Sequence, residues 1–306
     1  MSEKTPIEKL KAIISENRPN LSRNSTTTYA SLLKSIYLTN NREVDSKMDL
    51  EWFLNPANVI NAVRDRPTNT RKSLIAAVTV LIKPANVAPE LTQMMMSDVK
   101  KIDKQYASQK KTPKQEENWI EFEDVERLEK RLFESVKSWF NQKQPLDFDQ
   151  SRMMTDWLIV ALSSGVYFPP RRSEWASVKI KDYNPEKENY IDMKRGVFVL
   201  NEYKTAKLYG REEVAFGKPL GALLKKYIAL VPDNTYLFEK NGDPYTTSYI
   251  TFKLNRIFGK NVSTSMLRHI YASHKYGDNM PALEDLKKEA KDMGHSLGMH
   301  LEYIVR

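Results

Sequence analysis

The sequence predicts a mainly α-helical protein of two domains, with a small antiparallel β-sheet inside the second domain. The chain of 306 residues is long enough for two domains. Apolar residues recur at helical spacing over most of its length, but short runs of β-type residues replace that spacing between residues 178 and 216. A polar, Lys-rich stretch at 100–118 interrupts both patterns. We therefore expect a first domain at 1–105, a linker at 106–117 and a second domain at 118–306.

The first domain is predicted to be a small bundle of helices. One amphipathic stripe runs through residues 29–37, after a Thr-rich start that offers N-cap oxygens. A second stripe at 74–82 ends before Pro84, and a third at 91–102 runs into the linker. Three stripes that each need a partner indicate a bundle with a core of its own.

The second domain is predicted to begin and end with helices. Apolar residues at helical spacing from Val125 to Trp139 indicate a long helix, and the run 157–162 indicates a helix buried nearly all round. Four short segments at 178–183, 190–192, 198–201 and 213–216 are then predicted to form an antiparallel meander. Helical spacing returns from Leu220 onward.

The charge balance points to a polyanionic partner. There are 48 Lys and Arg against 39 Asp and Glu, which gives a formal charge of +9 and a pI of about 9.3. The chain has no Cys, which excludes disulfides, thiolate metal sites and cysteine nucleophiles. With no signal-peptide pattern and no apolar run long enough to span a bilayer, we expect an intracellular protein, in a host cell or a virion.

Four polar segments of the second domain carry groups suited to phosphate chemistry. Arg171-Arg172-Ser173-Glu174 follows a buried helix, and Lys204 lies where one predicted strand turns into the next. Arg268 is embedded in an apolar helix, where an unpaired charge would be costly. A Gly-His pair at 294–295 is followed eight residues later by Tyr303. Taken alone, the first segment could be a solvated charge pair and the second an ordinary surface turn.

In this order and spacing, the segments resemble the tyrosine recombinases, or phage-integrase family, with the second domain similar to the catalytic domain and the first to the core-binding domain. The resemblance implies a site-specific recombinase that cleaves and rejoins double-stranded DNA through a 3′-phosphotyrosine. It also implies a tetramer on DNA, a monomer when free, and an origin in a virus or other mobile element. The family pattern places Arg three residues before Glu174, which selects Arg171 over Arg172. The site residues implied are Arg171, Lys204 (with Lys207 as the alternative), Ser265, Arg268, His295 and Tyr303.

Two features depart from the family pattern. The family usually has a His three residues before the second arginine, and Ser265 stands there. The family also commonly separates its Gly-His histidine from the tyrosine by nine residues, where this chain has eight, and only three residues follow Tyr303. One proton carrier is therefore altered, and the tail that family members often exchange between subunits is short.

The chemistry explains why these residue types are needed. Cleavage builds negative charge on the phosphate oxygens, which Arg171 and Arg268 would stabilise. Tyr303 would be the nucleophile and Lys204 the general acid for the leaving 5′ oxygen, while His295 would hydrogen-bond the phosphate or position the nucleophile. The ester conserves the energy of the broken bond, so no cofactor is expected. The histidine pairs are five residues apart rather than four, so no metal site is expected either.

Basic residues of the first domain are the expected DNA contacts. They are Arg23, Lys34, Arg64, Arg66, Arg71 and Lys72. Together with the Lys-rich linker they would let two domains close around a duplex, mostly through phosphates. For any one of them, a solvated helix face is the alternative. For the whole chain two alternatives stay open: a type IB topoisomerase, which uses similar groups, and a DNA-binding protein of this fold with weakened catalysis.

Overall fold

The computed structural model describes residues 5–40, 48–277 and 283–305. The chain divides into two compact units, Met1–Ser108 and Gln109–Arg306. The described part is mostly helical with a small antiparallel sheet, so the predicted fold class is confirmed. The division falls inside the region predicted to link the domains.

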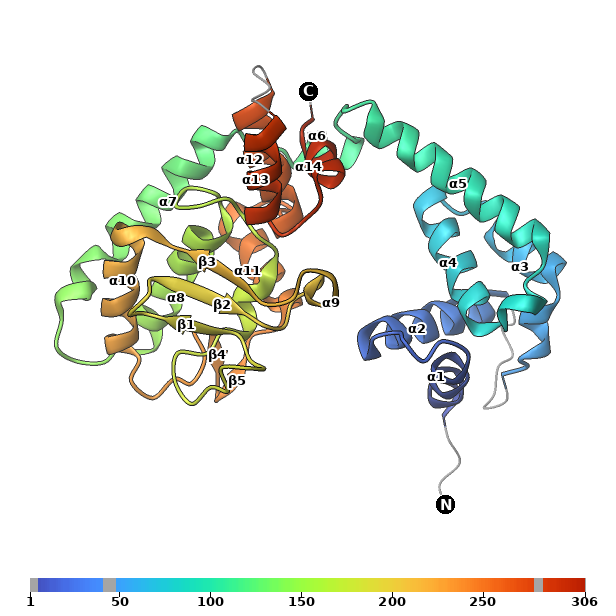
Figure 1. Ribbon diagram of the computed structural model, residues 1–306, viewed down its shortest axis with the longest axis horizontal. Coiled ribbons are helices and arrows are strands. Elements are labelled where there is room, and N and C mark those ends of the chain that lie inside the picture. Colours follow the sequence, from blue (N-terminus) through green and yellow to red (C-terminus); the bar gives the residue numbers. More distant parts are fainter. Residues whose placement is uncertain (1–4, 41–47, 278–282, 306) are drawn as a thin grey trace. The chain divides into compact units, whose positions relative to one another are not determined.

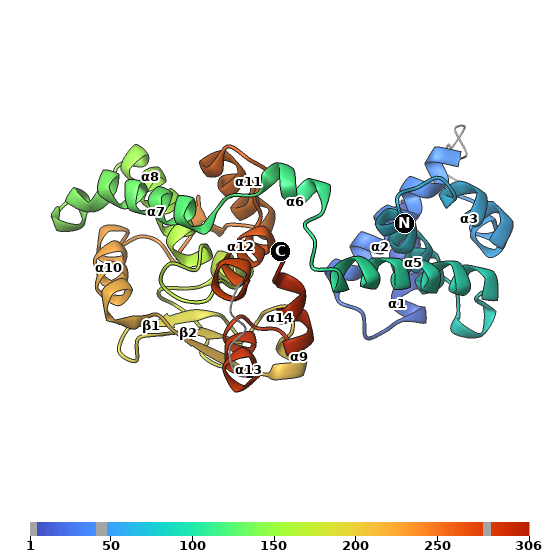
Figure 2. The ribbon, with the colours of Figure 1, turned by 90° about the horizontal axis from the view of Figure 1, so that it is seen from above.

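The first unit is a helical bundle (Figures 1 and 2). Its helices are α1 (Pro6–Asn17), α2 (Arg23–Asn40), α3 (Pro56–Val63), α4 (Thr68–Leu81) and α5 (Pro89–Ala107), with 3₁₀ turns at Glu51–Leu54 and Pro84–Asn86. The predicted stripes meet in one core, where Leu33, Ile75 and Val78 are fully buried. Bundles of this kind are stable because each helix buries its apolar face against the others.

The segment predicted as a linker is largely helical. Helix α5 continues to Ala107, and α6 spans Pro113–Asn118. Thr112 accepts a hydrogen bond from the Gln115 backbone N–H, and the Gln115 side chain accepts one from the Thr112 N–H. This capping box, with Pro113 in the first turn, starts a short helix in an otherwise polar sequence. The irregular connection is therefore shorter than the predicted 106–117.

The second unit combines its sheet with several helices. Its elements are α7 (Phe122–Val136), a 3₁₀ turn at Lys137–Asn141, α8 (Phe148–Ser163), a 3₁₀ turn at Ser173–Ser177, β1 (Tyr190–Asp192), β2 (Val197–Leu200), α9 (Ala206–Tyr209), β3 (Glu212–Ala215), α10 (Gly217–Leu230), β4 (Glu239–Lys240), β5 (Asp243–Pro244), α11 (Thr247–Phe258), α12 (Thr264–Tyr276), α13 (Leu283–Asp292) and α14 (Leu297–Tyr303). The second half of α8 is buried all round, as predicted for 157–162, and Trp157 there is fully buried in the core.

The sheet has three antiparallel strands in the order β1-β2-β3. The first of the four predicted segments, 178–183, is not a strand. Within it, Lys179 forms only isolated bridges to Tyr190 and Tyr236. The chain turns soon afterwards, because Asp182 adopts a left-handed conformation with φ of 52°. The prediction of a four-segment meander is wrong at this point, since β-type composition does not reveal where a chain turns.

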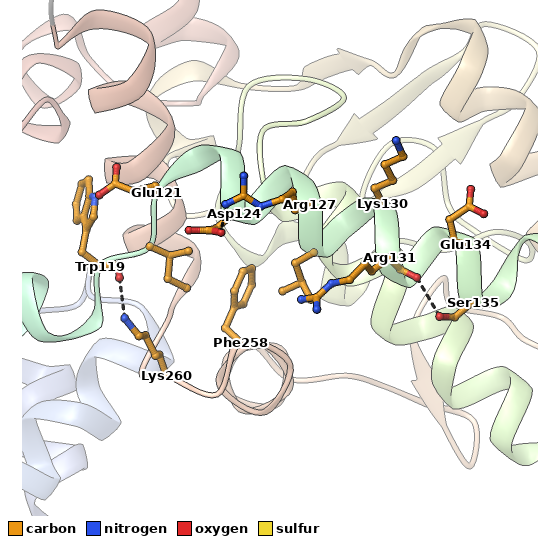
Figure 3. A pocket seen from close by; sticks show the side chains of 12 residues that line it. Trp119, Glu121, Asp124, Arg127, Lys130, Arg131, Glu134, Ser135, Phe258 and Lys260 are labelled. Carbon is orange, nitrogen blue, oxygen red and sulfur yellow. Dashed lines mark hydrogen bonds and ion pairs between the residues drawn. The ribbon is translucent and has the colours of Figure 1, made fainter.

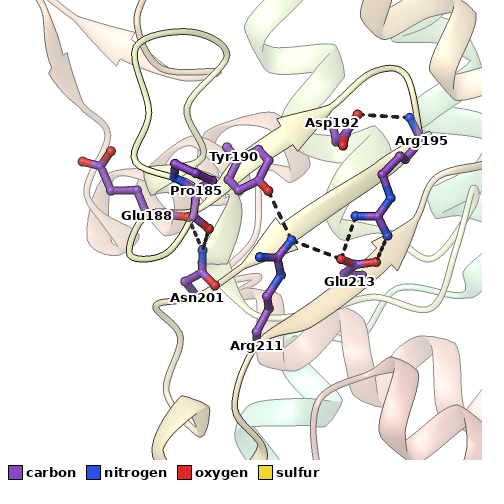
Figure 4. A network of polar contacts seen from close by, with 8 residues as sticks. All are labelled: Pro185, Glu188, Tyr190, Asp192, Arg195, Asn201, Arg211 and Glu213. Carbon is purple, nitrogen blue, oxygen red and sulfur yellow. Dashed lines mark hydrogen bonds and ion pairs between the residues drawn. The ribbon is translucent and has the colours of Figure 1, made fainter.

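A polar network holds the sheet together on its exposed side (Figure 4). Arg195 and Arg211 both bind Glu213 of β3, and Arg211 also donates to the Tyr190 hydroxyl of β1 at 3.2 Å. Asn201, directly after β2, donates to the carbonyls of Pro185 and Glu188. These contacts anchor both ends of the connection 201–211, which carries Lys204.

Helices α12, α13 and α14 lie together at one end of the second unit (Figures 1 and 2). They share a small core of their own, which includes Tyr276, Leu286, Tyr303 and Ile304. Since Arg268, His295 and Tyr303 belong to this group of helices and to the turn between α13 and α14, their positions depend on how the three helices pack.

Candidate active site

Arg268 is the centre of the candidate site. Its side chain is fully buried on α12, where Nη1 donates to the Tyr303 hydroxyl at 2.7 Å and Nη2 to the Met293 carbonyl at 3.1 Å. Nη2 also contacts Nδ1 of His295. Burial lowers the pKa of the guanidinium to about 10, so it keeps its charge at neutral pH. A fixed cation therefore lies directly against the predicted nucleophile.

Tyr303 ends helix α14 with its ring and hydroxyl turned inward. The side chain is 5% exposed, and its ring lies 4.3 Å from the Arg268 guanidinium carbon. The Tyr303 carbonyl accepts a hydrogen bond from the Ser273 hydroxyl at 3.4 Å and lies 3.0 Å from Nδ1 of His269. Ser296 begins the helix by accepting the Met299 backbone N–H. Tyr303 is thus held by contacts of its side chain and of its backbone carbonyl.

Gly294 explains the Gly-His pair. It adopts φ of 69°, in the left-handed region that disfavours side chains, and a Cβ there would lie 2.7 Å from Nη2 of Arg171. The glycine lets the turn between α13 and α14 pass close to that guanidinium. His295 follows, 8% exposed, and its Nε2 lies 3.0 Å from Nδ1 of His300. Burial, together with the Arg268 charge, lowers the pKa of His295 to about 2, so the ring is neutral.

Arg171 is buried beneath this turn. Nη1 donates to the Asp292 carbonyl at 2.9 Å, and Nη2 lies 2.6 Å from Oε2 of Glu212 on β3. The side chain is 1% exposed. The structure thus brings Arg171, Arg268, His295 and Tyr303 together, and a cavity of about 770 Å³ opens beside Arg171 and His295.

Lys204 lies on the exposed connection between β2 and β3. Its pKa is lowered, first by the charge of Arg172, then by partial burial and the charge of Arg268. Its ammonium group is therefore within electrostatic reach of Arg172 and Arg268. Lys207, the alternative, is exposed on α9.

Arg172 is the neighbour of Arg171 that the family spacing did not select. It is half-buried, and among the residues that the structure describes its guanidinium has no hydrogen bond or ion pair. Its charge acts on Lys204, Arg268 and His295. Counting back from Glu174 selects Arg171, but the side chain of Arg171 is already engaged by protein groups, whereas that of Arg172 is free.

Ser265 does not join the cluster. It is exposed in the first turn of α12 and makes no hydrogen bond within the described part of the chain. The sequence pattern gave His269 and His300 no role in the site, since they were weighed only as metal ligands. Both contact the site: His269 packs its ring 4.6 Å from that of Tyr303, and burial lowers its pKa to about 4. The sequence offers a signal only for His300, which lies three residues before Tyr303 on the same helix and so shares a face with it.

The predicted DNA contacts of the first unit differ in surroundings. Arg23, Arg64 and Arg66 are exposed, and Lys34 and Lys72 are half-buried. Arg71 instead binds the buried Asp98 of α5 through two hydrogen bonds, 2.7 Å from Nε and 2.5 Å from Nη2. Its guanidinium joins α4 to α5, a structural role that the sequence pattern did not reveal, and a DNA contact by Arg71 stays a prediction.

Other features of the described residues do not add a site. No cluster of three or more His, Asp or Glu side chains that could hold a metal ion occurs among them. None of their helices combines the length and apolarity that crossing a membrane would need. A cavity of about 970 Å³ lies along α7 beside Phe258 and Lys260 and contains none of the predicted site residues (Figure 3).

Comparison with known proteins identifies the fold. No protein-family model and no curated protein sequence matches the chain. Among solved structures, it is similar to the Tn1549 transposon integrase in complex with a circular intermediate DNA, at 16% identity and a TM-score of 0.54 over 99% of this chain and 96% of that one. It is also similar to the XerH site-specific recombinase bound to its difH substrate, at 16% identity and a TM-score of 0.51 over 99% and 95% of the two chains. The chain as a whole therefore has the fold of the tyrosine recombinases, as its sequence motifs predicted.

Proposed function

We propose that the chain is a site-specific DNA recombinase of the integrase type that cleaves and rejoins DNA strands through a 3′-phosphotyrosine at Tyr303. The observation that carries this proposal is the 2.7 Å contact between the Tyr303 hydroxyl and the buried Arg268 guanidinium. The integrase and XerH, whose fold the chain shares, are both described with DNA bound. A basic chain of two units fits a DNA partner.

The contact suits nucleophilic attack. A guanidinium can only donate, so the Tyr303 hydroxyl accepts from Arg268, and its own proton can pass to water or to a phosphate oxygen of the bound DNA as the oxygen attacks. A positive charge at this distance favours the phenolate that forms as the oxygen attacks phosphorus. The same guanidinium, with Arg172 beside it, would stabilise the charge that develops on the non-bridging oxygens.

Lys204 suits the leaving group. As the bond from phosphorus to the 5′ oxygen breaks, that oxygen needs a proton, and an ammonium group gives up its proton more readily when its pKa is lowered. Resealing runs the same steps backward, with a 5′ hydroxyl displacing Tyr303. No step requires a metal or a nucleotide cofactor.

A trapping experiment tests the proposal without knowledge of the target sequence. The substrates are short nicked duplexes with randomised centres. After cleavage, the short fragment that carries the 5′ hydroxyl diffuses away and the strand cannot be resealed. A covalent adduct therefore accumulates for any sequence that the protein accepts. The wild-type protein should form adducts that survive detergent, and Tyr303→Phe should form none while binding DNA equally. Tyr271→Phe, another buried tyrosine of the same unit, is the matched control and should form adducts. Adducts that persist in Tyr303→Phe would overturn the assignment.

A second assay separates recombination from topoisomerase activity. Sequences enriched in the adducts would be placed in two separate duplexes and, independently, in a supercoiled plasmid. A recombinase exchanges strands between the two duplexes. Relaxation of the plasmid with no exchanged product would favour a type IB topoisomerase instead.

A further inference from the structure

His300 is a buried histidine with no place in the proposed chemistry. Its side chain is fully buried on α14, three residues before Tyr303, and the two side chains share one face of that helix. Its ring packs edge-to-face against Tyr276 at 5.4 Å, and its Nδ1 lies 3.0 Å from Nε2 of His295. It reaches Arg268 only through His295.

The partners of the two rings assign their protons. Arg268 can only donate, so Nδ1 of His295 must accept from it. His295 is neutral and carries one proton, which is therefore on Nε2 and points at Nδ1 of His300. His300, whose pKa is also lowered by burial, then carries its own proton on its Nε2. Arg268 therefore donates to His295, and His295 in turn donates to His300.

The outer end of this chain lies in the field of a carboxylate. Nε2 of His300 is buried and has no hydrogen-bond partner within the described residues, and the same is true of Oε1 of Glu289 on α13. The other carboxylate oxygen of Glu289 accepts from Lys275 at 2.6 Å. The negative charge of Glu289 acts on His300 and opposes the effect of burial.

We propose that His300 is a positioning residue of the recombinase site: it accepts the Nε2–H of His295 and so holds the His295 lone pair against Arg268. This inference rests on the proposed function for its effect on cleavage, but its tautomers are a property of the free protein. Helix α14 then acts on Arg268 twice, directly through Tyr303 and indirectly through His300 and His295. A guanidinium held by both contacts keeps one orientation toward the nucleophile.

Without an acceptor at residue 300, the His295 N–H would be buried and unpaired, which is unfavourable. The ring would relieve this by moving its proton to Nδ1 or by turning. Either change removes the lone pair from Arg268 and frees the guanidinium to rotate. Partners that orient a functional histidine are typically worth about 10- to 100-fold in activity.

Two variants separate positioning from packing. His300→Phe keeps the size of the ring and removes the acceptor, whereas His300→Asn is smaller but keeps an acceptor oxygen near the Nδ1 position. If His300 only fills space, Asn is the more harmful change, because it leaves a cavity and a polar group in a buried site. If it positions His295, Phe is the more harmful change to cleavage.

The first measurement needs no DNA. The chain has four histidines, so nitrogen-15 spectra of histidine-labelled protein at pH 7 can be assigned by single substitutions, with the exposed His274→Gln as the control. We expect His295 and His300 both protonated on Nε2 in the wild type, and the His295 tautomer lost in His300→Phe but kept in His300→Asn. A wild-type His295 protonated on Nδ1, or one unchanged in His300→Phe, would overturn the proposal.

The second measurement is the single-turnover rate of adduct formation at saturating protein. We expect His300→Phe to be slowed about 10- to 100-fold with unchanged DNA affinity, and His300→Asn to be clearly faster than His300→Phe. The reverse order contradicts a positioning role. If the wild type forms no adduct at all, the proposed function fails, and the spectra still decide the tautomers. If His300→Phe does not fold, the wild-type tautomers and the rate of His300→Asn relative to the wild type decide the question.

Discussion

Arg268 shows how a buried cation is tolerated and used. An isolated charge in a protein interior is strongly unfavourable, and three acceptors compensate this one: the Tyr303 hydroxyl, the Met293 carbonyl and Nδ1 of His295. Its Nε has no partner within the described residues. The same contacts that stabilise the charge also hold it against the nucleophile, so substitutions here should act on structure and chemistry together.

Arg268→Lys should therefore be far more damaging than Ser265→Ala. Lysine keeps the charge but lacks the planar fork that contacts Tyr303 and His295 together, and the loss of one transition-state donor typically costs about 100- to 1,000-fold. Ser265 is exposed and touches none of these groups, so its loss should cost less than about threefold by the same reasoning. Single-turnover adduct formation compares them. Equal losses would show that Ser265 belongs to the site.

Arg172 should set the alkaline limit of cleavage through Lys204. The general acid works below its pKa, which the charge of Arg172 lowers more than any other cause. Arg172→Gln should raise that pKa, so the fall in rate at high pH should move to higher pH. The matched variant is Arg171→Gln, which should move the limit less, because Glu212 already pairs with the Arg171 charge.

The control for this prediction is a substrate with sulfur in place of the bridging 5′ oxygen. A thiolate leaves without a proton, so cleavage of this substrate should not depend on Lys204, and Lys204→Ala should be rescued by it. A pH limit that stays unchanged in Arg172→Gln would mean that Lys204 is not the acid, or that Arg172 is not its neighbour.

At the scale of elements, the site depends on the group α12, α13 and α14. Gly294 allows the turn that carries His295 to approach Arg171, and α14 then presents His300 and Tyr303 on one face. This group holds the buried His295 and His300 and the half-buried His269, and burial lowers the pKa of all three rings. Their burial ties the stability of the second unit to pH.

Acid should destabilise the second unit before it affects the first. In the unfolded chain each histidine binds a proton near its ordinary pKa of about 6.5, while in the folded chain His269 does so only near about 4 and His295 near about 2. The unfolded state therefore binds more protons below about pH 6.5, and stability falls as the pH falls through that window. Glu129 acts in the opposite direction, because its burial raises its pKa.

Urea unfolding of Trp52→Phe measures this effect, since the four remaining tryptophans lie in the second unit. We expect the free energy of unfolding to be lower at pH 5.5 than at pH 7 by about 1–4 kcal/mol. The first unit has no histidine and supplies the internal comparison. A second unit that is as stable at pH 5.5 as at pH 7 would mean that these rings are not buried as neutral groups.

The sequence predicted most of the longer helices and the three-stranded sheet, and the order of its motifs predicted that Arg171, Arg268, His295 and Tyr303 would meet. Arg268 and Tyr303 could be assigned from the sequence because their residue types and their spacing form a motif. The role of His300 has no such signal, because it arises only when α14 packs its inner face against α12. The capping box at Thr112 and Gln115 was readable in the sequence, but the polar composition around it obscured a six-residue helix. The choice between Arg171 and Arg172 depends on which side chain protein groups already occupy, which spacing does not reveal.

At the scale of the whole molecule, two units joined by a short connection would each contribute a modest DNA contact. A fragment of residues 109–306 should fold alone, since it has its own core, yet bind a duplex about 100-fold or more weakly than the full chain. The affinity of the full chain should also fall more steeply with salt, because more phosphates are neutralised. Equal affinity would show that the first unit serves another partner.

The central claim is that Tyr303 becomes covalently joined to a 3′ phosphate of DNA. The most direct measurement is to digest the trapped adduct with protease and nuclease and to locate the modified residue by mass spectrometry. We expect one modified peptide, with the nucleotide joined to Tyr303 through its 3′ phosphate and a free 5′ hydroxyl on the released strand. A nucleotide on Tyr271 or any other residue, or a 5′ phosphate in the linkage, would contradict it.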